Sequence, residues 1–185
     1  RDLERRAFGR GRFAEMLRWG LIPSWAKDMK IGAKMNNARG ETVAEKPAFR
    51  AAFKRWRCII PASGFYEWKV IDGKKQPFYI RPADDGLSER WEGAAEPDAA
   101  KRVIHSCAIV TTDPNELMQT IHDRMPVILE PEDYAAWLDP ANHDTERLKK
   151  LIRPLPAEQM RAYPVSRKVN VVKNNDPSNL EPVAI

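Results

Sequence analysis

The chain contains 185 residues, 43% of them hydrophobic, and carries a formal net charge of +5. A chain of this length can bury a substantial core and lies within the usual size of one domain, so we expect a single domain over residues 1–185. No apolar run is long enough to cross a bilayer and no signal peptide is recognisable, which argues against a membrane protein and favours the cytoplasm.

The charge is divided unevenly along the chain. Residues 1–82 carry 19 Lys and Arg against 8 Asp and Glu, a net +11, whereas residues 83–185 carry 12 against 18, a net −6. A basic half attracts a phosphate backbone, because Lys and Arg release condensed counterions when they neutralise it. The alternative is that the two halves fold against each other and their charges cancel.

The two cysteines, Cys58 and Cys107, lie within apolar runs, as small hydrophobic residues inside strands do. Neither a Cys-x-x-Cys nor a His-x-x-x-His spacing occurs. The sequence therefore supports neither a metal site nor a disulfide framework.

The first part of the chain combines cations with two tryptophans and a Leu-Ile-Pro run at 21–23 that we expect to be exposed. Residues 1–12 hold five arginines and two glycines, which indicates a flexible basic segment. A strand is predicted at 13–19, followed by a Gly- and Pro-containing loop at 20–28. Aromatic rings beside cations suit single-stranded nucleic acid, where bases stack on the rings. The alternative, expected for at least one of Trp19 and Trp25, is burial in the core.

Asn37 and Arg39 lie two residues apart and share a face if the segment is extended, an arrangement that suits a phosphate or a sugar oxygen. A capping-box pattern at Thr42 then predicts a helix over residues 42–55. One stripe of this helix is basic, which is usually a solvated face but would attract an anion beside a cleft. It contains Lys46, Arg50, Lys54 and Arg57.

Residues 58–70 read as a buried strand with one residue whose burial is energetically unfavourable, the carboxylate-bearing Glu67. Strand alternation puts Glu67 on the opposite face from Tyr66 and Trp68, where it could face a cleft at the edge of a sheet. A carboxyl group partly desolvated by aromatic neighbours has a raised pKa, which suits a general acid or base near neutral pH. The alternative is a strand-edge carboxylate paired with an Arg.

An Asp-Gly turn at 72–73 predicts a hairpin with a return strand at 77–81. Residues 82–101 read as an irregular surface segment, and 105–112 as the next strand. A short helix is predicted to follow, with Asp113 as its N-cap.

His122, Asp123 and Arg124 form a second candidate site, between this helix and a strand predicted at 127–129. A histidine titrates near neutrality, and functional residues concentrate at junctions between elements. The alternative is a structural histidine.

The remaining elements read as scaffold. Amphipathic helices are predicted at 131–138 and 144–153, and short strands at 163–166 and 169–172, with residues 173–185 wrapping the surface. Several short strands mixed with capped helices predict an α+β fold with a largely antiparallel, curved sheet.

Four blocks of the sequence resemble, in order, the SOS response associated peptidase (SRAP) family, which handles abasic sites in DNA. They read RWGLIPSWA, NARGET, IPASGFYEWK and HDRMP, at residues 18–26, 37–42, 60–69 and 122–126. The resemblance extends over most of the chain. It implies a barrel-like sheet flanked by helices, with a basic groove across one face.

The resemblance also implies a chemistry. Self-processing removes the initiator Met and exposes an amino-terminal cysteine, which attacks the ring-opened aldehyde of an abasic site in single-stranded DNA. The cysteine's amine and thiol then close a thiazolidine, a stable DNA–protein crosslink. We therefore expect an enzyme of hydrolase and lyase type without metal or organic cofactor, acting as a monomer near the nucleoid.

The resemblance also matches individual functional residues of the family to positions in this sequence. Glu67 resembles the family's acid–base carboxylate and His122 the histidine that moves protons, while Asn37 resembles the residue that holds the lesion and completes the catalytic set. The residues implied to contact DNA are Arg39, Trp19, Pro23, Arg50, Thr111 and Arg124.

One departure from the family leaves other functions open. The family begins Cys-Gly-Arg-Phe, whereas this chain begins with Arg1, so we expect that it lacks its native amino-terminal segment. A first alternative is a non-catalytic module for single-stranded or junction DNA. A second is a cysteine peptidase with Cys58 as nucleophile and His122 as base, which is disfavoured because a reactive thiolate needs exposure.

Overall fold

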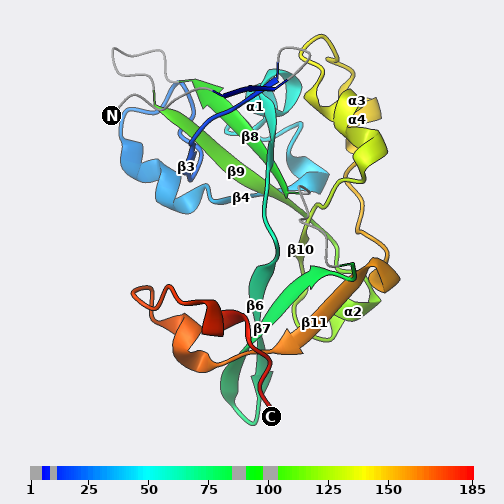
Figure 1. Ribbon diagram of the computed structural model, residues 1–185. Helices are drawn as coiled ribbons and strands as arrows, with labels where there is room; N and C mark the ends of the chain where they lie inside the picture. The colour runs from blue at the N-terminus through cyan, green and yellow to red at the C-terminus, as the bar shows by residue number, and fades with distance from the viewer. Residues whose placement is uncertain (1–5, 9–11, 85–90, 98–103) are drawn as a thin grey trace.

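The computed structural model describes residues 6–8, 12–84, 91–97 and 104–185, so most of the basic segment at 1–12 lies outside the described residues. A six-stranded and a three-stranded sheet with helices around them, and a separate two-stranded sheet, form an α+β fold with an upper and a lower part (Figure 1). The α+β class predicted from the sequence is confirmed.

Strand β9 (His105–Thr112), which has the predicted boundaries, is the centre of a six-stranded mixed sheet. It pairs antiparallel with β8, and β8 pairs antiparallel with β5. It also pairs with β3 and β4, which run parallel to it, and with the antiparallel β10. These strands are β3 (Arg18–Trp19), β4 (Asn37–Arg39), β5 (Arg57–Ile60), β8 (Trp91–Pro97) and β10 (Met125–Pro126).

The second sheet has three antiparallel strands in the order β11-β7-β6, which makes β6 an edge strand among the described residues. Strand β6 (Phe65–Ile71) turns into β7 (Lys74–Pro82), and β11 (Met160–Pro164) covers the far edge of β7. Asp72 and Gly73 have φ values of 49° and 72°, as the two-residue hairpin turn requires. The predicted hairpin is therefore confirmed.

The single barrel-like sheet that the resemblance implied is not found, because the described strands form separate sheets and close no barrel. The predicted strand at 58–70 breaks at residues 61–64, which carry the chain from β5 in one sheet to β6 in the other. Pro61 cannot donate to a strand ladder. Gly64 packs so closely on β7 that a Cβ there would lie 2.5 Å from the carbonyl oxygen of Ile80.

Several predicted elements are shorter than expected or differ in kind. The helix expected over 42–55 is formed only at α1, because Pro47 has no N–H to donate to the preceding turn. The N-cap of α2 is Asn115 rather than Asp113, and its side chain accepts from the Met118 N–H at 2.9 Å. The helices are α1 (Arg50–Arg55), α2 (Glu116–Gln119), α3 (Tyr134–Leu138) and α4 (Thr145–Lys149).

Two segments were assigned wrongly from the sequence. The irregular surface segment expected at 82–101 contains β8, an inner strand of the six-stranded sheet. The strand expected at 169–172 is replaced by the end of a 3₁₀ helix and a turn. The 3₁₀ helices are η1 (Met29–Lys34), η2 (Gly40–Thr42), η3 (Pro131–Asp133), η4 (Ala157–Gln159), η5 (Arg167–Asn170) and η6 (Pro177–Leu180).

A separate apolar cluster stabilises each of the two parts. One includes Ile80 and Met118 and lies between the three-stranded sheet and α2. Another includes Phe53 and Trp137 and packs α1 and α3 beside the six-stranded sheet. Neither Trp19 nor Trp25 joins a core, since their exposed fractions are 59% and 57%, so the expected burial of one of them is wrong.

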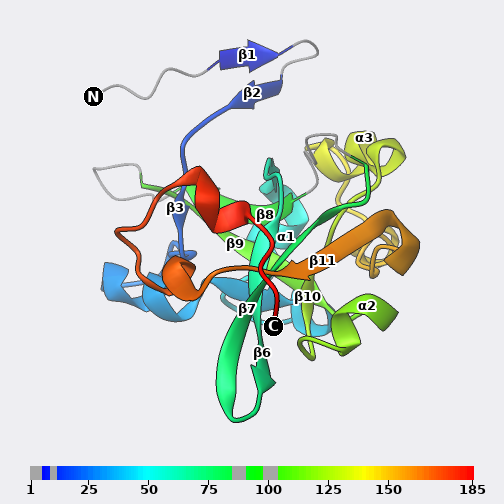
Figure 2. The same ribbon diagram turned by 60° about the horizontal axis from the view of Figure 1, so that its bottom comes forward.

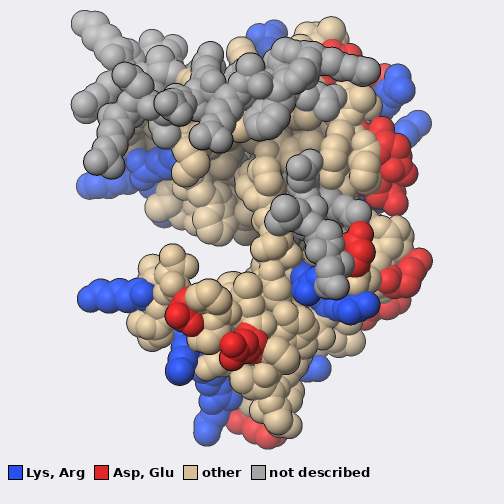
Figure 3. Space-filling view, in the orientation of Figure 1, with Lys and Arg blue, Asp and Glu red and all other residues tan. Residues whose placement is uncertain are grey.

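The molecule is hollowed between its upper and lower parts (Figure 3). On this face the hollow is bordered mostly by uncharged residues, with Lys and Arg at its outer rim, so this view does not show the basic groove that the resemblance implied. The β1–β2 hairpin (Arg6–Phe8 and Arg12–Ala14) stands away from the rest of the fold (Figure 2).

Candidate active site

Glu67 and His122 come together although 54 residues separate them in the sequence. Glu67 lies on the edge strand β6, and His122 follows α2, whose backbone ends in a hydrogen bond from the His122 N–H to the Met118 carbonyl at 2.8 Å. The His122 Nε2 lies 3.9 Å from Glu67 Oε2. The partner of Glu67 is thus a histidine, and the alternative of a structural pair with Arg is wrong.

Burial raises the pKa of Glu67 above its ordinary value, as the sequence predicted. The nearby His122 and the Trp68 backbone N–H act in the opposite direction, because both favour the carboxylate. Of the Glu67 side chain, 26% is exposed, so water and a substrate can reach it. A carboxyl group with a raised pKa holds its proton closer to neutral pH and can both donate and accept it.

The other ring nitrogen of His122 has partners for either protonation state. The Arg124 backbone N–H donates to Nδ1 at 3.1 Å, which suits a neutral ring with its proton on Nε2, the nitrogen that faces Glu67. Asp123 Oδ1 lies 3.1 Å and the Arg124 carbonyl oxygen 3.2 Å from Nδ1, and either can accept from a protonated Nδ1. A proton on Nδ1 would therefore replace the hydrogen bond from the Arg124 N–H by one to Asp123 or to the Arg124 carbonyl.

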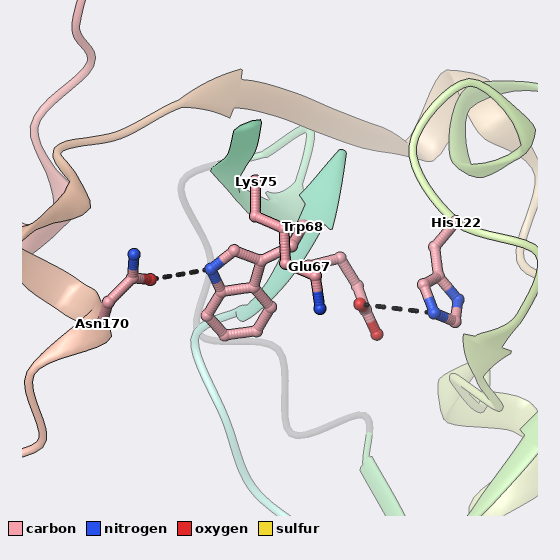
Figure 4. A pocket seen from close by; sticks show the side chains of 5 residues that line it. All are labelled: Glu67, Trp68, Lys75, His122 and Asn170. Carbon is pink, nitrogen blue, oxygen red and sulfur yellow. Dashed lines mark hydrogen bonds and ion pairs between the residues drawn. The ribbon is translucent and has the colours of Figure 1, made fainter. Parts of the chain in front are cut away.

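Glu67 and His122 line a cavity of about 290 Å³ together with Trp68, Lys75 and Asn170. Figure 4 shows the indole of Trp68 forming one wall beside the Glu67 carboxyl group. The Trp68 Nε1–H donates to Asn170 Oδ1 at 2.8 Å, which fixes the ring and ties η5 to β6. The cavity therefore combines an aromatic wall, a cation and an acid–base pair.

Arg124 forms a second, much tighter cluster. Its guanidinium contacts both carboxylate oxygens of Glu41 and donates to Asp113 Oδ1 at 3.0 Å and to the Thr111 carbonyl at 2.8 Å. Its Nε is buried without a hydrogen-bond partner among the described residues. The hydrogen bond from Arg124 lowers the pKa of Glu41, the opposite of the shift at Glu67.

The Asn37 and Arg39 side chains are exposed on the same face of β4, while Ala38 between them is 1% exposed. The expectation that they share a face is confirmed. Arg39 is paired in register with Thr111 of β9, and its charge also lowers the pKa of Glu41. Arg39, Thr111 and Arg124 thus lie in one region, as the predicted DNA contacts would require.

The other predicted DNA contacts are more scattered. Trp19 is exposed on β3 and donates from Nε1 to the Asn36 carbonyl at 2.9 Å, which places its ring beside the start of β4. Pro23 is buried in the following loop with Leu21 and Ile22, so the expected exposure of this Leu-Ile-Pro run is wrong. Arg50 is exposed at the first residue of α1.

The cysteines lie on the six-stranded sheet. Burial raises the pKa of Cys107 to about 11, so its thiol stays protonated. Cys58 lies on β5, whereas the side-chain partners of His122 include Glu67 of β6 and Asp123. This arrangement gives no support to a Cys58–His122 peptidase.

The described part of the chain holds no group of three or more His, Cys, Asp or Glu placed to bind a metal ion. None of its helices has the length and apolar character needed to cross a membrane.

Sequence reasoning missed the residues that complete the cavity and the Arg124 cluster. Lys75 could have been found, since the hairpin register brings it near Trp68, the neighbour of Glu67. Asn170 gave no local signal, because its hydrogen bond to Trp68 crosses 102 residues. The pairing of Glu41 with Arg124 spans 83 residues and was equally hidden.

Comparison with known proteins places these observations in context. The model of the family described as SOS response associated peptidase (SRAP) matches residues 5–172. The abasic site processing protein YoqW of Bacillus subtilis is 51% identical over 172 residues, which cover 89% of this chain and 75% of YoqW. The abasic site processing protein HMCES of Xenopus tropicalis is 36% identical over 186 residues, covering 87% of this chain and 55% of HMCES.

The fold also matches a solved structure. An X-ray structure of a protein from Bacteroides thetaiotaomicron superposes with a TM-score of 0.81 at 31% sequence identity, covering 92% of this chain and 77% of the other. The likeness therefore extends over nearly the whole chain.

Proposed function

Since the chain belongs to the SOS response associated peptidase family, we propose that it processes abasic sites in single-stranded DNA by forming a covalent thiazolidine crosslink. The relatives YoqW and HMCES, both called abasic site processing proteins, support the substrate. The observation that carries the proposal is the pair of Glu67 and His122, 3.9 Å apart at a cavity.

The reaction needs a group that both gives and takes protons. Opening of the abasic deoxyribose requires a proton on the ring oxygen and exposes an aldehyde at C1′. An amine then adds to C1′, the former carbonyl oxygen leaves as water, and an imine remains. A thiol sulfur adds to the imine carbon, and its proton passes to the nitrogen as the thiazolidine closes.

Glu67 suits the acid–base role because burial raises its pKa. In its protonated form it donates to the ring oxygen and later to the departing hydroxyl group, and as a carboxylate it accepts a proton from the attacking amine. His122 exchanges protons with Glu67 through Nε2, and the contacts at Nδ1 hold its ring in both states. Asn37 holds the opened sugar from the exposed edge of β4.

The nucleophile in this proposal is an amino-terminal cysteine, which provides both the amine and the thiol. Removal of the initiator Met by self-processing would expose it. The 185-residue sequence begins with Arg1 and does not contain this cysteine.

DNA contacts in this proposal come from the six-stranded sheet and the segments beside it. The exposed guanidinium of Arg39 binds a phosphate, and the exposed ring of Trp19 stacks on a base. Thr111 and Arg124 border the same region. There Arg124 would contact a phosphate while it keeps its carboxylate partners. The exposed Arg50 completes the proposed contacts, whereas the buried Pro23 supports the loop behind them.

The test uses the natural full-length protein, expressed from its own initiator Met. It is mixed with single-stranded DNA that carries one abasic site, and the products are run on a denaturing gel. We expect a slow band that withstands denaturation and is missing with intact DNA. Binding on a native gel without this band would contradict the crosslink and favour a DNA-binding module without chemistry.

A further inference from the structure

Lys75 is a charged side chain of the cavity that the proposed chemistry leaves unused. It lines the cavity with Glu67, Trp68, His122 and Asn170, and it is the one Lys or Arg among these residues. Its side chain has no hydrogen-bond or ion-pair partner among the described residues, unlike Lys149, which pairs with Glu146 at 2.9 Å. Lys75 is therefore a cation available to a ligand in this cavity.

The hairpin explains how a lysine reaches a cavity that contains Glu67. Lys75 pairs in register with Val70, so it lies on the same face of the sheet as Trp68, opposite to Glu67. Strand β6 is an edge strand, and a cavity at an edge is open to side chains from both faces. In Figure 4 the Lys75 stem passes beside the indole of Trp68 and its amine points into the cavity toward the Glu67 carboxyl group.

The remaining wall is rigid and uncharged. The hydrogen bond from Trp68 to Asn170 holds the indole between Lys75 and the η5 segment. Long lysine side chains commonly lay their methylene stems along apolar surface while the amine stays in water. The Trp68 ring provides such a surface and directs the amine of Lys75.

We propose that Lys75 binds a phosphodiester group of the DNA strand whose abasic sugar lies against Glu67 and His122. This inference rests on the proposed function and adds to it a phosphate-binding position. A strand that places one sugar at the acid–base pair carries a phosphate on each side of it. A lysine amine is a compact charge that binds phosphate without demanding one geometry, which suits a flexible single strand.

The hairpin offers a matched control. Lys74 is the neighbouring residue, is exposed, and pairs with Ile71 on the opposite face of the hairpin. It is not among the residues that line the cavity. Lys74→Ala and Lys75→Ala change the net charge equally, so any difference between them reports the position of the charge rather than its amount.

The experiment measures binding of a single-stranded oligonucleotide that carries one tetrahydrofuran abasic-site analogue. This analogue has no aldehyde, so binding is measured without chemistry. Wild type, Lys75→Ala, Lys75→Arg and Lys74→Ala are compared over a series of salt concentrations. Thermal melting of each variant shows whether it is folded.

We expect Lys75→Ala to weaken binding about two- to fivefold, the range of one solvent-exposed charge contact. The slope of log affinity against log salt should fall by about 0.7, the value for one phosphate on single-stranded DNA. Lys75→Arg should retain the slope and Lys74→Ala should match wild type. Equal salt slopes for Lys75→Ala and Lys74→Ala would overturn the binding of a phosphate by Lys75, and would leave the proposed function untouched.

Other outcomes separate this inference from the proposed function. If the slope falls as expected but aldehyde-bearing DNA gives no crosslink, the phosphate position stands and the proposed chemistry fails. If wild type does not bind the oligonucleotide at all, both are overturned.

Discussion

Two glutamates contact the same short segment, residues 122–124, and behave in opposite ways. Glu67 faces His122 at 3.9 Å, and burial raises its pKa. Glu41 binds the guanidinium of Arg124 through both oxygens, and the hydrogen bond from Arg124 lowers its pKa. The partner decides the difference, because arginine is always charged whereas histidine exchanges its proton near neutral pH.

This contrast assigns different roles, proton transfer and structural support, to groups that lie within a few residues of one another. A carboxylate locked to Arg124 stays ionised and holds η2 and the end of β9 together. A carboxyl group loosely paired with a histidine can change its charge during a reaction. We therefore assign proton transfer to Glu67 and His122, and structural support to the cluster around Arg124.

The largest expected effect is on the reaction rate of Glu67→Gln. The amide cannot give or take a proton, so the rate of crosslink formation should fall about 100-fold or more. The rate is measured from the early appearance of the covalent band with abasic DNA.

Glu41→Gln is the matched control for this rate. Both substitutions remove one carboxylate next to residues 122–124, but only Glu67 lines the cavity. Equal losses of rate in the two variants would contradict the division between chemistry and support.

The next largest effect is on stability, in Arg124→Met. The substitution leaves Glu41 and Asp113 without their cation and the Thr111 carbonyl without a donor. Because the Glu41 side chain is about half exposed and that of Asp113 is largely exposed, the loss in free energy of unfolding should be about 1–2 kcal/mol. Urea unfolding measures this loss.

Crosslinking by Arg124→Met sharpens the comparison. The backbone N–H of residue 124 still donates to His122 Nδ1 after the substitution, so proton transfer should persist. If the chemical step of folded Arg124→Met, at saturating DNA, were as slow as that of Glu67→Gln, the supporting role of Arg124 would be wrong.

The two glutamates should also affect stability in opposite pH ranges. The pKa of Glu67 is raised, so its favourable contribution is present below the unfolded value and is lost as pH rises through the folded one. The pKa of Glu41 is lowered, so its contribution is present above the unfolded value and is lost as pH falls through the folded one.

Urea midpoints measured over a pH series check these signs. Relative to wild type, Glu67→Gln should gain stability as pH rises above the ordinary pKa of a glutamate. Glu41→Gln should instead gain on wild type as pH falls below that value. Curves with the same sign for both variants would refute the contrast.

The smallest expected effect is that of Cys58→Ala. Cys58 lies on β5, in a different sheet from Glu67, and the proposed chemistry does not use its thiol. Crosslinking by the natural full-length protein should be unchanged within error. Loss of activity in a folded Cys58→Ala protein would favour the peptidase alternative.

The acid–base pair could be predicted because its residues are locally conspicuous. Glu67 is a carboxylate in an apolar run, and His122 lies at the junction of a helix and a strand. The hairpin at 72–73 and the full extent of β9 also follow from local turn chemistry and apolar pattern.

The division into two sheets could not be predicted, because it depends on long-range pairing. The break at residues 61–64 becomes necessary only when Gly64 meets β7. Strand β8 was missed because its sequence, Trp91–Pro97, contains Gly and Ala instead of the alternating apolar pattern that marks a strand. The same limit applies to Glu41, whose partner Arg124 lies 83 residues away.

The most direct test of the central claim is the pH dependence of crosslinking by the natural full-length protein and by Glu67→Gln. We expect the wild-type rate to change across a pKa above the ordinary value of a glutamate, and Glu67→Gln to lack this change and to be slow at every pH. A Glu67→Gln profile with the rate and shape of wild type would contradict the claim, because the proton would then be moved by another group.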